Sequence, residues 1–409
     1  MDQFRSDIIR SEYRNYYPTS TQNFNAPNKK IEFNIDYGDN FSMPKYQYYI
    51  AVTFNKKADE AAYGTDDNIA LVSNFVPFLF SHIEVRKHNH LIDEVEYPGV
   101  TSTVRSIVSN KQTDSFALKN SGFEHGIKGG GTKNKFYVCG SLHQLGLGFF
   151  EDISSPIYKG GITISFIRDD DDNCLYRWKS KKADGTFDDT SLPAEGKVTI
   201  DEFIIRVPMI EYKPTSKIKL IKHLVDAKMV PFNFRKWQCI RKTDIAGSSL
   251  TFDITNTYRN VQNPTFIMVA FQDKSNKAQL RDASCFSHVS VKNIHVKIND
   301  AQYPEELQNF NIDNGNYALL YEMLKDFKNV YSNNNDMMYE PQKFITDKCV
   351  YVIDTSKQGE NISNSKSNIL INVAFGKEIK STDKVNLYVV VISHVSLVYD
   401  IVNNVIKTM

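Results

Sequence analysis

The sequence has few tryptophans, few cysteines and no excess of charge of either sign. Its 409 residues include only two tryptophans and five cysteines, and 49 lysines and arginines are balanced by 48 aspartates and glutamates. A formal net charge of +1 excludes nucleic-acid binding by bulk charge, because that mode needs a strongly basic stripe that displaces counterions. We therefore expect no sequence-specific binding of nucleic acid.

The cysteines are also far apart, since the closest two, Cys139 and Cys174, are separated by 35 positions and no CxxC occurs. This spacing supports neither a zinc ribbon nor a dithiol redox site, and it favours reduced thiols in a protein made inside a cell. The N-terminus has scattered charges and no apolar run, so we expect no signal peptide. The most apolar stretch, 387–399, is too short to span a membrane and predicts a strand buried on both faces.

What the chain does contain is phenylalanine and tyrosine, 26 and 22 of them, which favour half-buried strands. Three segments of the first half also recur in order in the second half. In the first pair, IEFNID and IAVTFNKK of the first half match LTFDIT and FIMVAFQDK of the second. In the second pair, FSHIEVRKHNHLIDEVEYPG matches FSHVSVKNIHVKINDAQYPE. In the third pair, GKVTIDEFIIRVPMIEYKP matches DKVNLYVVVISHVSLVYDI. The offset between matching residues falls from 217 to 187, so the strands match while the loops differ in length.

Each copy has short alternating strands, long polar loops and one helical stripe, at 98–110 and 316–327. We expect Asp313 and Asn314 to cap the second helix. The pattern predicts an all-β fold of two tandem jelly-roll sandwiches, with a few short helices in loops and linker. Pro208 lies inside a long predicted strand, where we expect a bulge or an edge.

The predicted division of the chain has four parts: an N-terminal arm (1–30), a first jelly roll (31–213), a linker helix (214–234) and a second jelly roll (235–409). In the linker, Ile218, Ile221, Leu224 and Val225 form an apolar stripe that predicts a packed helix ended by Pro231.

The first 17 residues carry apolar side chains on one side of a possible helix, which favours an arm that docks on a neighbour or on a membrane surface.

No motif predicts catalysis, a cofactor or a metal site. The glycines of 128–133 lack the Walker spacing, and Asp169–Asp172 with Asn173 lack the EF-hand spacing, so we interpret both segments as loops. His88 and His90 would share a face of a strand but have no further ligand nearby. The acidic residues of the first Phe-Ser-His segment are interpreted as ordinary surface charges: Glu84, Asp93, Glu94 and Glu96. His82 and His288 occupy equivalent repeat positions, which suggests a structural role.

Two helix-bearing jelly rolls in tandem resemble the double-jelly-roll major capsid proteins of the adenovirus, virophage and Polinton (Maverick) type. The segments 74–99 and 145–177 are most similar to the Polinton-like proteins, and the likeness extends over about residues 31–400. The chain is short for this group, so we expect low surface towers.

The resemblance implies a structural subunit of a virion and not an enzyme. Three copies would form a homotrimeric, pseudo-hexagonal capsomer that tiles an icosahedral shell. The implied partners are the chain itself, penton and minor capsid proteins, and an internal membrane reached by the N-terminal arm. Assembly would take place inside the host cell. The alternative is a jelly-roll glycan-binding module or a carbohydrate-active hydrolase, although Trp178 and Trp237 are the only tryptophans available as sugar platforms.

Overall fold

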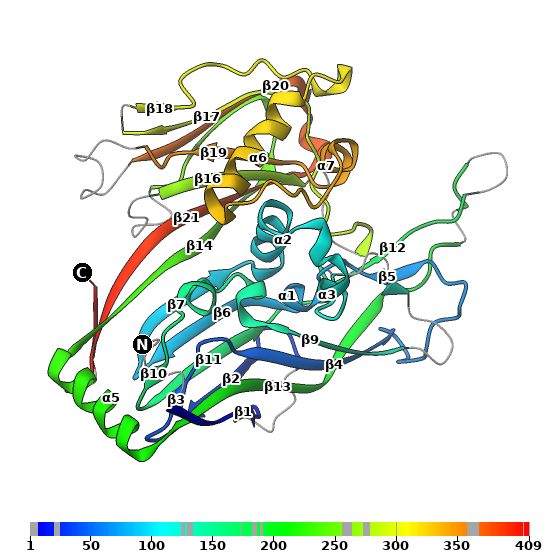
Figure 1. Ribbon diagram of the computed structural model, residues 1–409. Coiled ribbons are helices and arrows are strands. Elements are labelled where there is room, and N and C mark those ends of the chain that lie inside the picture. The colour runs from blue at the N-terminus through cyan, green and yellow to red at the C-terminus, as the bar shows by residue number, and fades with distance from the viewer. Residues whose placement is uncertain are drawn as a thin grey trace.

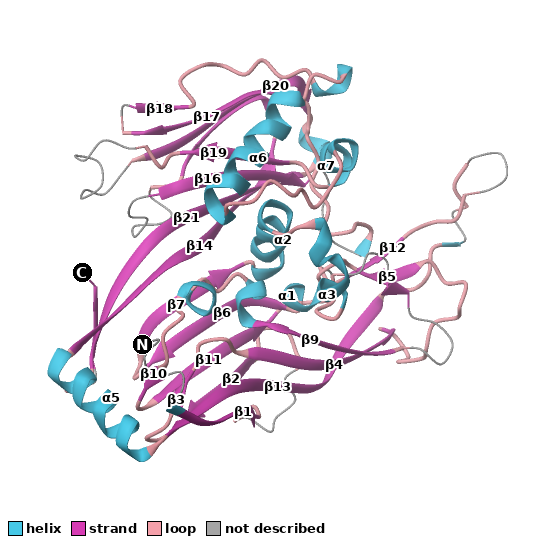
Figure 2. Cartoon of the chain, viewed as in Figure 1, coloured by secondary structure: helices cyan, strands magenta, loops and turns pink. Residues whose placement is uncertain are grey.

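Alternation of apolar and polar residues makes most of the chain β-strand. In β2 (Lys30–Asp36), for example, Ile31, Phe33 and Ile35 are buried while the residues between them face outward. The computed structural model describes residues 7–19, 25–123, 127–128, 134–171, 173–181, 186–188, 191–255, 264–272, 279–299, 301–357, 368–403 and 405–408. These residues form two β-sandwiches that lie one beside the other and are joined at one end by a single helix (Figures 1 and 2).

The first sandwich consists of two antiparallel sheets. One sheet has the order β10 (Ile157–Tyr158), β3 (Phe41–Ser42), β13 (Gly196–Tyr212), β4 (Gln47–Lys56) and β9 (Lys135–Ser141), with β1 (Ile8–Tyr16) also paired to β13. The facing sheet has the order β2, β11 (Gly161–Arg168), β6 (Phe80–Lys87) and β7 (His90–Glu96). A small third sheet contains β12 (Leu175–Arg177), β5 (Ile69–Leu71) and β8 (Ile127–Lys128).

The second sandwich repeats this plan. One sheet has the order β14 (Met229–Ile245), β21 (Val385–Asp400), β16 (Pro264–Gln272) and β19 (Val350–Asp354), with β22 (Val405–Thr408) also on β21. The other has the order β15 (Gly247–Asp253), β20 (Ile369–Ile379), β17 (Val291–Ile298) and β18 (Ala301–Tyr303). Seven strands of each copy therefore occupy equivalent positions, from β2 and β15 through β13 and β21, and the three repeated segments all fall on such pairs. The predicted all-β fold of two jelly rolls is confirmed.

The helix of each copy forms between equivalent strands, as predicted. They are α2 (Pro98–Ser109) and α6 (Ala318–Ser332). The predicted cap of the second helix is wrong, because Tyr317 is its N-cap while Asp313 and Asn314 lie in a preceding 3₁₀ turn. The shorter helices are α1 (Phe75–Phe78), α3 (Ser115–Lys119), α4 (Phe149–Asp152) and α7 (Pro341–Asp347).

The linker helix α5 (Pro214–Ala227) is shorter than expected. It ends at Ala227 rather than near Pro231, because Lys228 has a positive φ of 58° and strand β14 begins at Met229. Residues 229–234 thus belong to a sheet of the second sandwich. The buried side chains of α5 are Ser216, Leu220 and Leu224. Of the predicted apolar stripe, therefore, only Leu224 is buried, while Ile218 and Val225 are exposed.

The N-terminal arm is a strand and not a helix over the residues described. Strand β1 pairs antiparallel with β13 from Ile8, opposite Tyr212, to Tyr16, opposite Ile205. The helical spacing of its apolar residues was misleading, because β13 offers an open edge of backbone donors and acceptors that a helix would leave unpaired. The arm therefore extends the sheet of its own sandwich.

Pro208 shows no bulge of its own, since the register shift of β13 lies between Ile200 and Glu202. The β4 ladder ends at Arg206 and the short β3 ladder begins at Met209, so the proline sits where β13 changes neighbours and a donor is dispensable. The predicted burial of 387–399 is confirmed for 387–393 and 397–399, whereas His394 and Ser396 are exposed. Strand β21 also pairs with β14 along one edge and with β16 along the other.

Several strand ends of the first copy that adjoin long polar segments lie at the end of the molecule opposite α5. Lys56 pairs with Gly196 and Thr53 with Lys135, so β4 ends and β9 and β13 begin at that end, near β5 and β12 (Figure 1). Segment 354–368 leaves β19 at the other end of the second sandwich, because Asp354 pairs with Phe266 near the start of β16. We call this end of the first sandwich, where β4 ends and β9 and β13 begin, the raised end.

Candidate functional site

The junction between the two sandwiches contains several buried or half-buried polar side chains that pair with one another. Helices α2 and α4 and strand β7 of the first copy contact β14 and α6 of the second (Figure 1). Because all these contacts join segments far apart in sequence, they determine whether the two copies behave as one rigid body. We call this region the seam.

Backbone contact brings α4 directly against β14. A Cβ atom on Gly148 would lie only 1.6 Å from the carbonyl oxygen of Arg235, so only glycine permits this approach. The next residue, Phe149, packs edge-to-face on Phe232 and Phe234, with ring centroids 5.6 and 5.7 Å away. A glycine followed by an aromatic anchor thus places the carboxylates at the end of α4 against the second sandwich.

Arg235 binds Asp152 through both of its oxygens. The Nη2 and Nε atoms donate to Oδ1 and Oδ2 at 2.5 and 3.0 Å, and the backbone N–H of Arg235 donates to Oδ2 at 2.7 Å. The guanidinium also stacks on the Tyr331 ring at 3.9 Å and donates to the Tyr331 carbonyl at 3.2 Å. Although burial opposes the charge, the bond to Asp152 raises the pKa of Arg235 above its usual value. Lysine could not replace Arg235 here, because an ammonium group cannot form this planar, two-point contact with a carboxylate.

Glu151 adds a second charged contact beside the first. It accepts from Arg105 of α2, with 2.8 Å between Nη2 and Oε1, and from the Tyr331 hydroxyl at 3.1 Å. Burial alone would raise the pKa of Glu151, but Arg105 and then Arg235 outweigh it and lower the pKa to about 2. The carboxylate therefore stays ionised and links a helix of each copy.

Strand β7 contributes two acidic residues with opposite surroundings. Glu94 pairs with Lys236 of β14 at 2.9 Å. Asp93 is fully buried and accepts from the backbone N–H groups of Phe149 and Glu94 at 3.0 and 2.9 Å. Burial, only partly offset by Lys236, raises the pKa of Asp93 to about 7. The interpretation of Asp93 as a surface charge is therefore wrong.

Two further polar side chains join the two sandwiches, one in the seam and one away from it. Lys328 of α6 is buried and donates to the carbonyls of Asn110 and Asp336, and burial lowers its pKa to about 8. Gln279 is buried at the raised end, where its amide accepts from the N–H of Gly196 at 2.8 Å and donates to its carbonyl at 2.7 Å. Each of these side chains belongs to the second copy and forms hydrogen bonds with backbone groups of the first copy.

The segments considered as ligand sites have other roles. Asp171 binds the buried Arg168 at 2.5 Å and Asp169 accepts from Asn173 at 3.2 Å, while Asp172 lies outside the described residues. His88 is in a hairpin turn at a positive φ of 47°, so it does not share a strand face with His90. Across the described ranges, no three His, Cys, Asp or Glu side chains are placed to hold a metal ion. Residues 129–133 of the glycine-rich loop are outside the description.

The aromatic and acidic candidates are similarly occupied. Trp237 is fully buried, and Trp178 stacks on Tyr176 at 5.2 Å. Glu84 binds Arg86 at 2.9 Å and His82 at 3.2 Å within strand β6.

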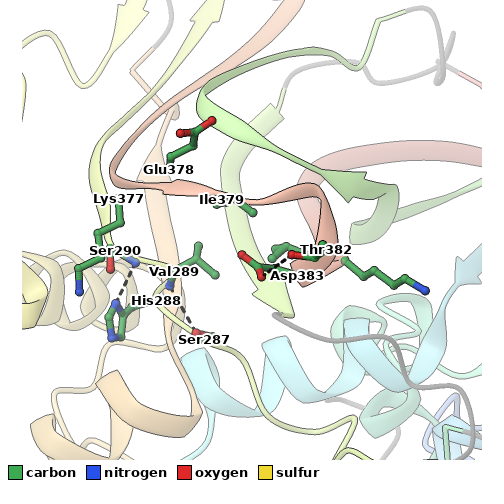
Figure 3. A pocket seen from close by; sticks show the side chains of 11 residues that line it. Ser287, His288, Val289, Ser290, Lys377, Glu378, Ile379, Thr382 and Asp383 are labelled. Atoms are coloured by element: carbon green, nitrogen blue, oxygen red, sulfur yellow. Dashed lines mark hydrogen bonds between the residues drawn. The ribbon is translucent and has the colours of Figure 1, made fainter.

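The two Phe-Ser-His segments differ in structure, and a cavity lies beside the second of them. In the first copy the segment continues strand β6, whereas in the second Val289 and Ser290 have positive φ values of 40° and 50° and β17 begins only at Val291. Beside them lies a cavity of about 610 Å³, which is lined on its other side by residues of 377–385 (Figure 3). Ser290 and His288 are not arranged as a nucleophile and its base. The Ser290 hydroxyl donates to Asp313 at 2.8 Å, and the imidazole Nδ1 of His288 accepts from the backbone N–H of Ser290.

Two jelly rolls locked by a charged seam define the class of protein as a double jelly roll. Solved structures with the same architecture include the major capsid protein of Faustovirus, with a TM-score of 0.60, 11% identity and coverage of 95% of this chain and 90% of that one. A chain in the structure of the Sputnik virophage gives a TM-score of 0.59 at 10% identity, covering 98% and 89%. The mavirus major capsid protein gives 0.56 at 12% identity, covering 97% and 90%.

The sequence model of the double jelly roll-like domain family matches residues 69–397, which is more than half of the chain. The chain therefore belongs to the double jelly roll-like domain family. Among curated proteins, none matches the sequence. Within the described part of the chain, no helix combines the length and the apolar character that a membrane span requires.

Proposed function

We propose that the chain is a major capsid protein, the structural subunit of an icosahedral virus shell. The observation that carries the proposal is the pair of equivalent sandwiches held side by side by the seam, because three such chains present six similar units around a threefold axis. The fold shared with major capsid proteins of Faustovirus and mavirus over at least 95% of this chain supports it. The functional form is a homotrimeric capsomer with a pseudo-hexagonal outline.

The chain acts by assembly and not by turnover. The polar groups of the seam are paired with one another rather than directed at a substrate, and Ser290, His288 and Asp313 do not form a proton relay toward a nucleophile. Its partners are other copies of itself, with penton and minor capsid proteins completing the shell. It resides in the virion capsid after assembly inside the host cell.

We further propose that the functional units are the two sandwiches 8–212 and 229–408, with α5 between them. The segment 8–16 is included because β1 belongs to a sheet of the first sandwich, and 229–234 because they begin β14. The raised end of the first sandwich would be the outer surface of the shell.

The test is the size and shape of the purified full-length chain. Three copies of 46.9 kDa give about 141 kDa, which light scattering coupled to gel filtration distinguishes from a monomer. Negative-stain microscopy should then show pseudo-hexagonal particles. A monomer that persists at about ten micromolar, far above the dissociation constant of a stable interface, would overturn the proposal.

A further inference from the structure

Helix α5 carries apolar side chains on the face that turns away from the protein. Leu220 and Leu224 are buried, whereas Ile218 is 67% and Val225 43% exposed. Ile218, Lys222 and Val225 follow one another at spacings of four and three residues, so they share one face of the helix, opposite the two leucines. On this face the two apolar side chains, Ile218 and Val225, are about two helical turns apart, and Lys222 lies between them.

The same helix concentrates positive charge. Residues 213–228 contain five lysines and a single acid, Asp226, in a chain whose total charge is only +1. The segment therefore contributes +4 and the rest of the chain is net negative. Lys213 is paired with Asp7 at 3.3 Å, and the charge of Lys219 also helps to lower the pKa of Asp7. Lys222 forms no ion pair of 4.0 Å or less with any described residue. The charge of Lys222 on this face is available to an anionic partner, and Lys219 adds an exposed charge beside it.

Apolar residues continue beyond the C-terminal end of α5. Met229 is 53% exposed and pairs with Asp400, and Val402 is 61% exposed in the turn that follows. The N–H of Ile401 donates to the carbonyl of Lys228 at 3.1 Å, which holds this turn against the helix end. We name the set Ile218, Lys219, Lys222, Val225, Met229 and Val402 the basal surface.

The position of α5 lets this surface meet a flat partner. The helix lies across one end of the molecule, where it joins the ends of β13 and β14, with both sandwiches on its inner side (Figure 1). An amphipathic helix binds a lipid interface when its axis lies in the plane of that interface and its apolar side chains enter the headgroup region. A helix across the end of the molecule fulfils this condition without any rearrangement.

We propose that the basal surface binds membranes that contain anionic phospholipids. Lysines alone would suit any polyanion, but Ile218 and Val225 stand on the same face as Lys222, and apolar insertion together with attraction to headgroups is specific to lipid. Duplex DNA would use the lysines and leave the two apolar side chains in water. This binding goes beyond the role of the chain in a shell and does not depend on it.

The experiment is flotation of the purified full-length protein with vesicles of phosphatidylcholine alone or with about 30 mol% phosphatidylserine. We expect binding to the anionic vesicles only, and weaker binding when salt rises from about 0.1 M to about 1 M, since the Debye length falls about threefold. The double variants I218D/V225D and K219E/K222E should each bind at least about tenfold more weakly.

Matched controls make the same changes elsewhere. L319D/V330D alters two exposed apolar residues of α6, and K292E/K343E reverses two exposed lysines of the second sandwich. Both should float like the wild type, and thermal unfolding should confirm that every variant is folded. Trimer formation, measured separately, should persist in I218D/V225D, so failure of lipid binding and failure of the capsid proposal remain distinguishable.

Three results would overturn the inference. The first is no flotation of the wild type at low salt. The second is binding that the control variants weaken as much as the basal variants do. The third is a gel shift with duplex DNA that K219E/K222E abolishes and I218D/V225D leaves unchanged, with no flotation, which would assign the charge to nucleic acid instead.

Discussion

Replacing Arg235 by methionine tests whether the seam couples the two sandwiches. The change removes the fork to Asp152, the bond to the Tyr331 carbonyl and the stacking on the Tyr331 ring, and it leaves the Asp152 carboxylate with a backbone N–H as its partner. Breaking a buried pair on one side destabilises by about 3–5 kcal/mol. About a fifth of each side chain is exposed, so we take the lower figure of about 3 kcal/mol.

This free energy translates into a small but measurable shift of the unfolding midpoint. At ~2.1 cal/mol/K per residue, the unfolding entropy of the chain is roughly 0.9 kcal/mol/K, so R235M should lower the midpoint by about 3–4 °C in calorimetry. The transition should also broaden or split as the sandwiches uncouple. The matched control is K57M, which breaks an ion pair to Glu195 that is largely exposed and should lose less than about 0.5 kcal/mol.

A double-mutant cycle with D152A isolates the contact itself. We expect a coupling free energy of about 1.5–3 kcal/mol between the two positions, because each single variant already loses the shared contact. If R235M shifts the midpoint no more than K57M, or if the two single effects are additive, the seam does not contribute as we argue.

Three further predictions concern the same region. The pKa of Asp93 in the folded state is about 7, above its ordinary value, so stability should fall by up to ~1.4 kcal/mol per pH unit between about pH 4 and pH 7; urea midpoints of D93N should show a flatter profile. The pKa of Glu151 is lowered to about 2, so its contribution is present above about pH 4.5 and lost as pH falls toward 2; near-ultraviolet dichroism during acid titration should lack this step in E151Q. G148A should lose about 1–3 kcal/mol by its clash with the Arg235 carbonyl, and an equal loss in G64A, whose nearest neighbour is 3.6 Å away, would contradict the steric reason.

The shape of the molecule explains why the copies diverged where they did. Strands facing the core of each sandwich must keep their period of two, and these are the segments that still match between the halves. The Phe-Ser-His segment matches by letter, yet Val289 and Ser290 leave the strand that Ile83 and Glu84 continue. The shared letters Phe-Ser-His therefore do not determine the backbone path of the residues that follow them.

The N-terminus and the linker show the limit of periodicity as a signal. Ile8, Tyr13 and Tyr16 are spaced as in a helix, but the free edge of β13 decides for a strand. In α5 the predicted helix is real, yet the stripe that defined it includes Ile218 and Val225, which no part of the described chain covers. Periodicity reports which residues can share a face and not which surface that face meets.

By itself, the sequence determined that the protein is built from two related β-sandwiches with a helix in each copy and a helix between them. That information is local and repeated, because alternation within a strand and the order of strands can be read along the chain. The tertiary structure alone decided the seam. Arg235 and Asp152 are 83 residues apart, and no pattern along the chain predicts that a glycine at 148 lets them meet. It also decided the burial of Asp93 and the exposure of Ile218, since burial depends on how elements pack and not on the residues within one of them.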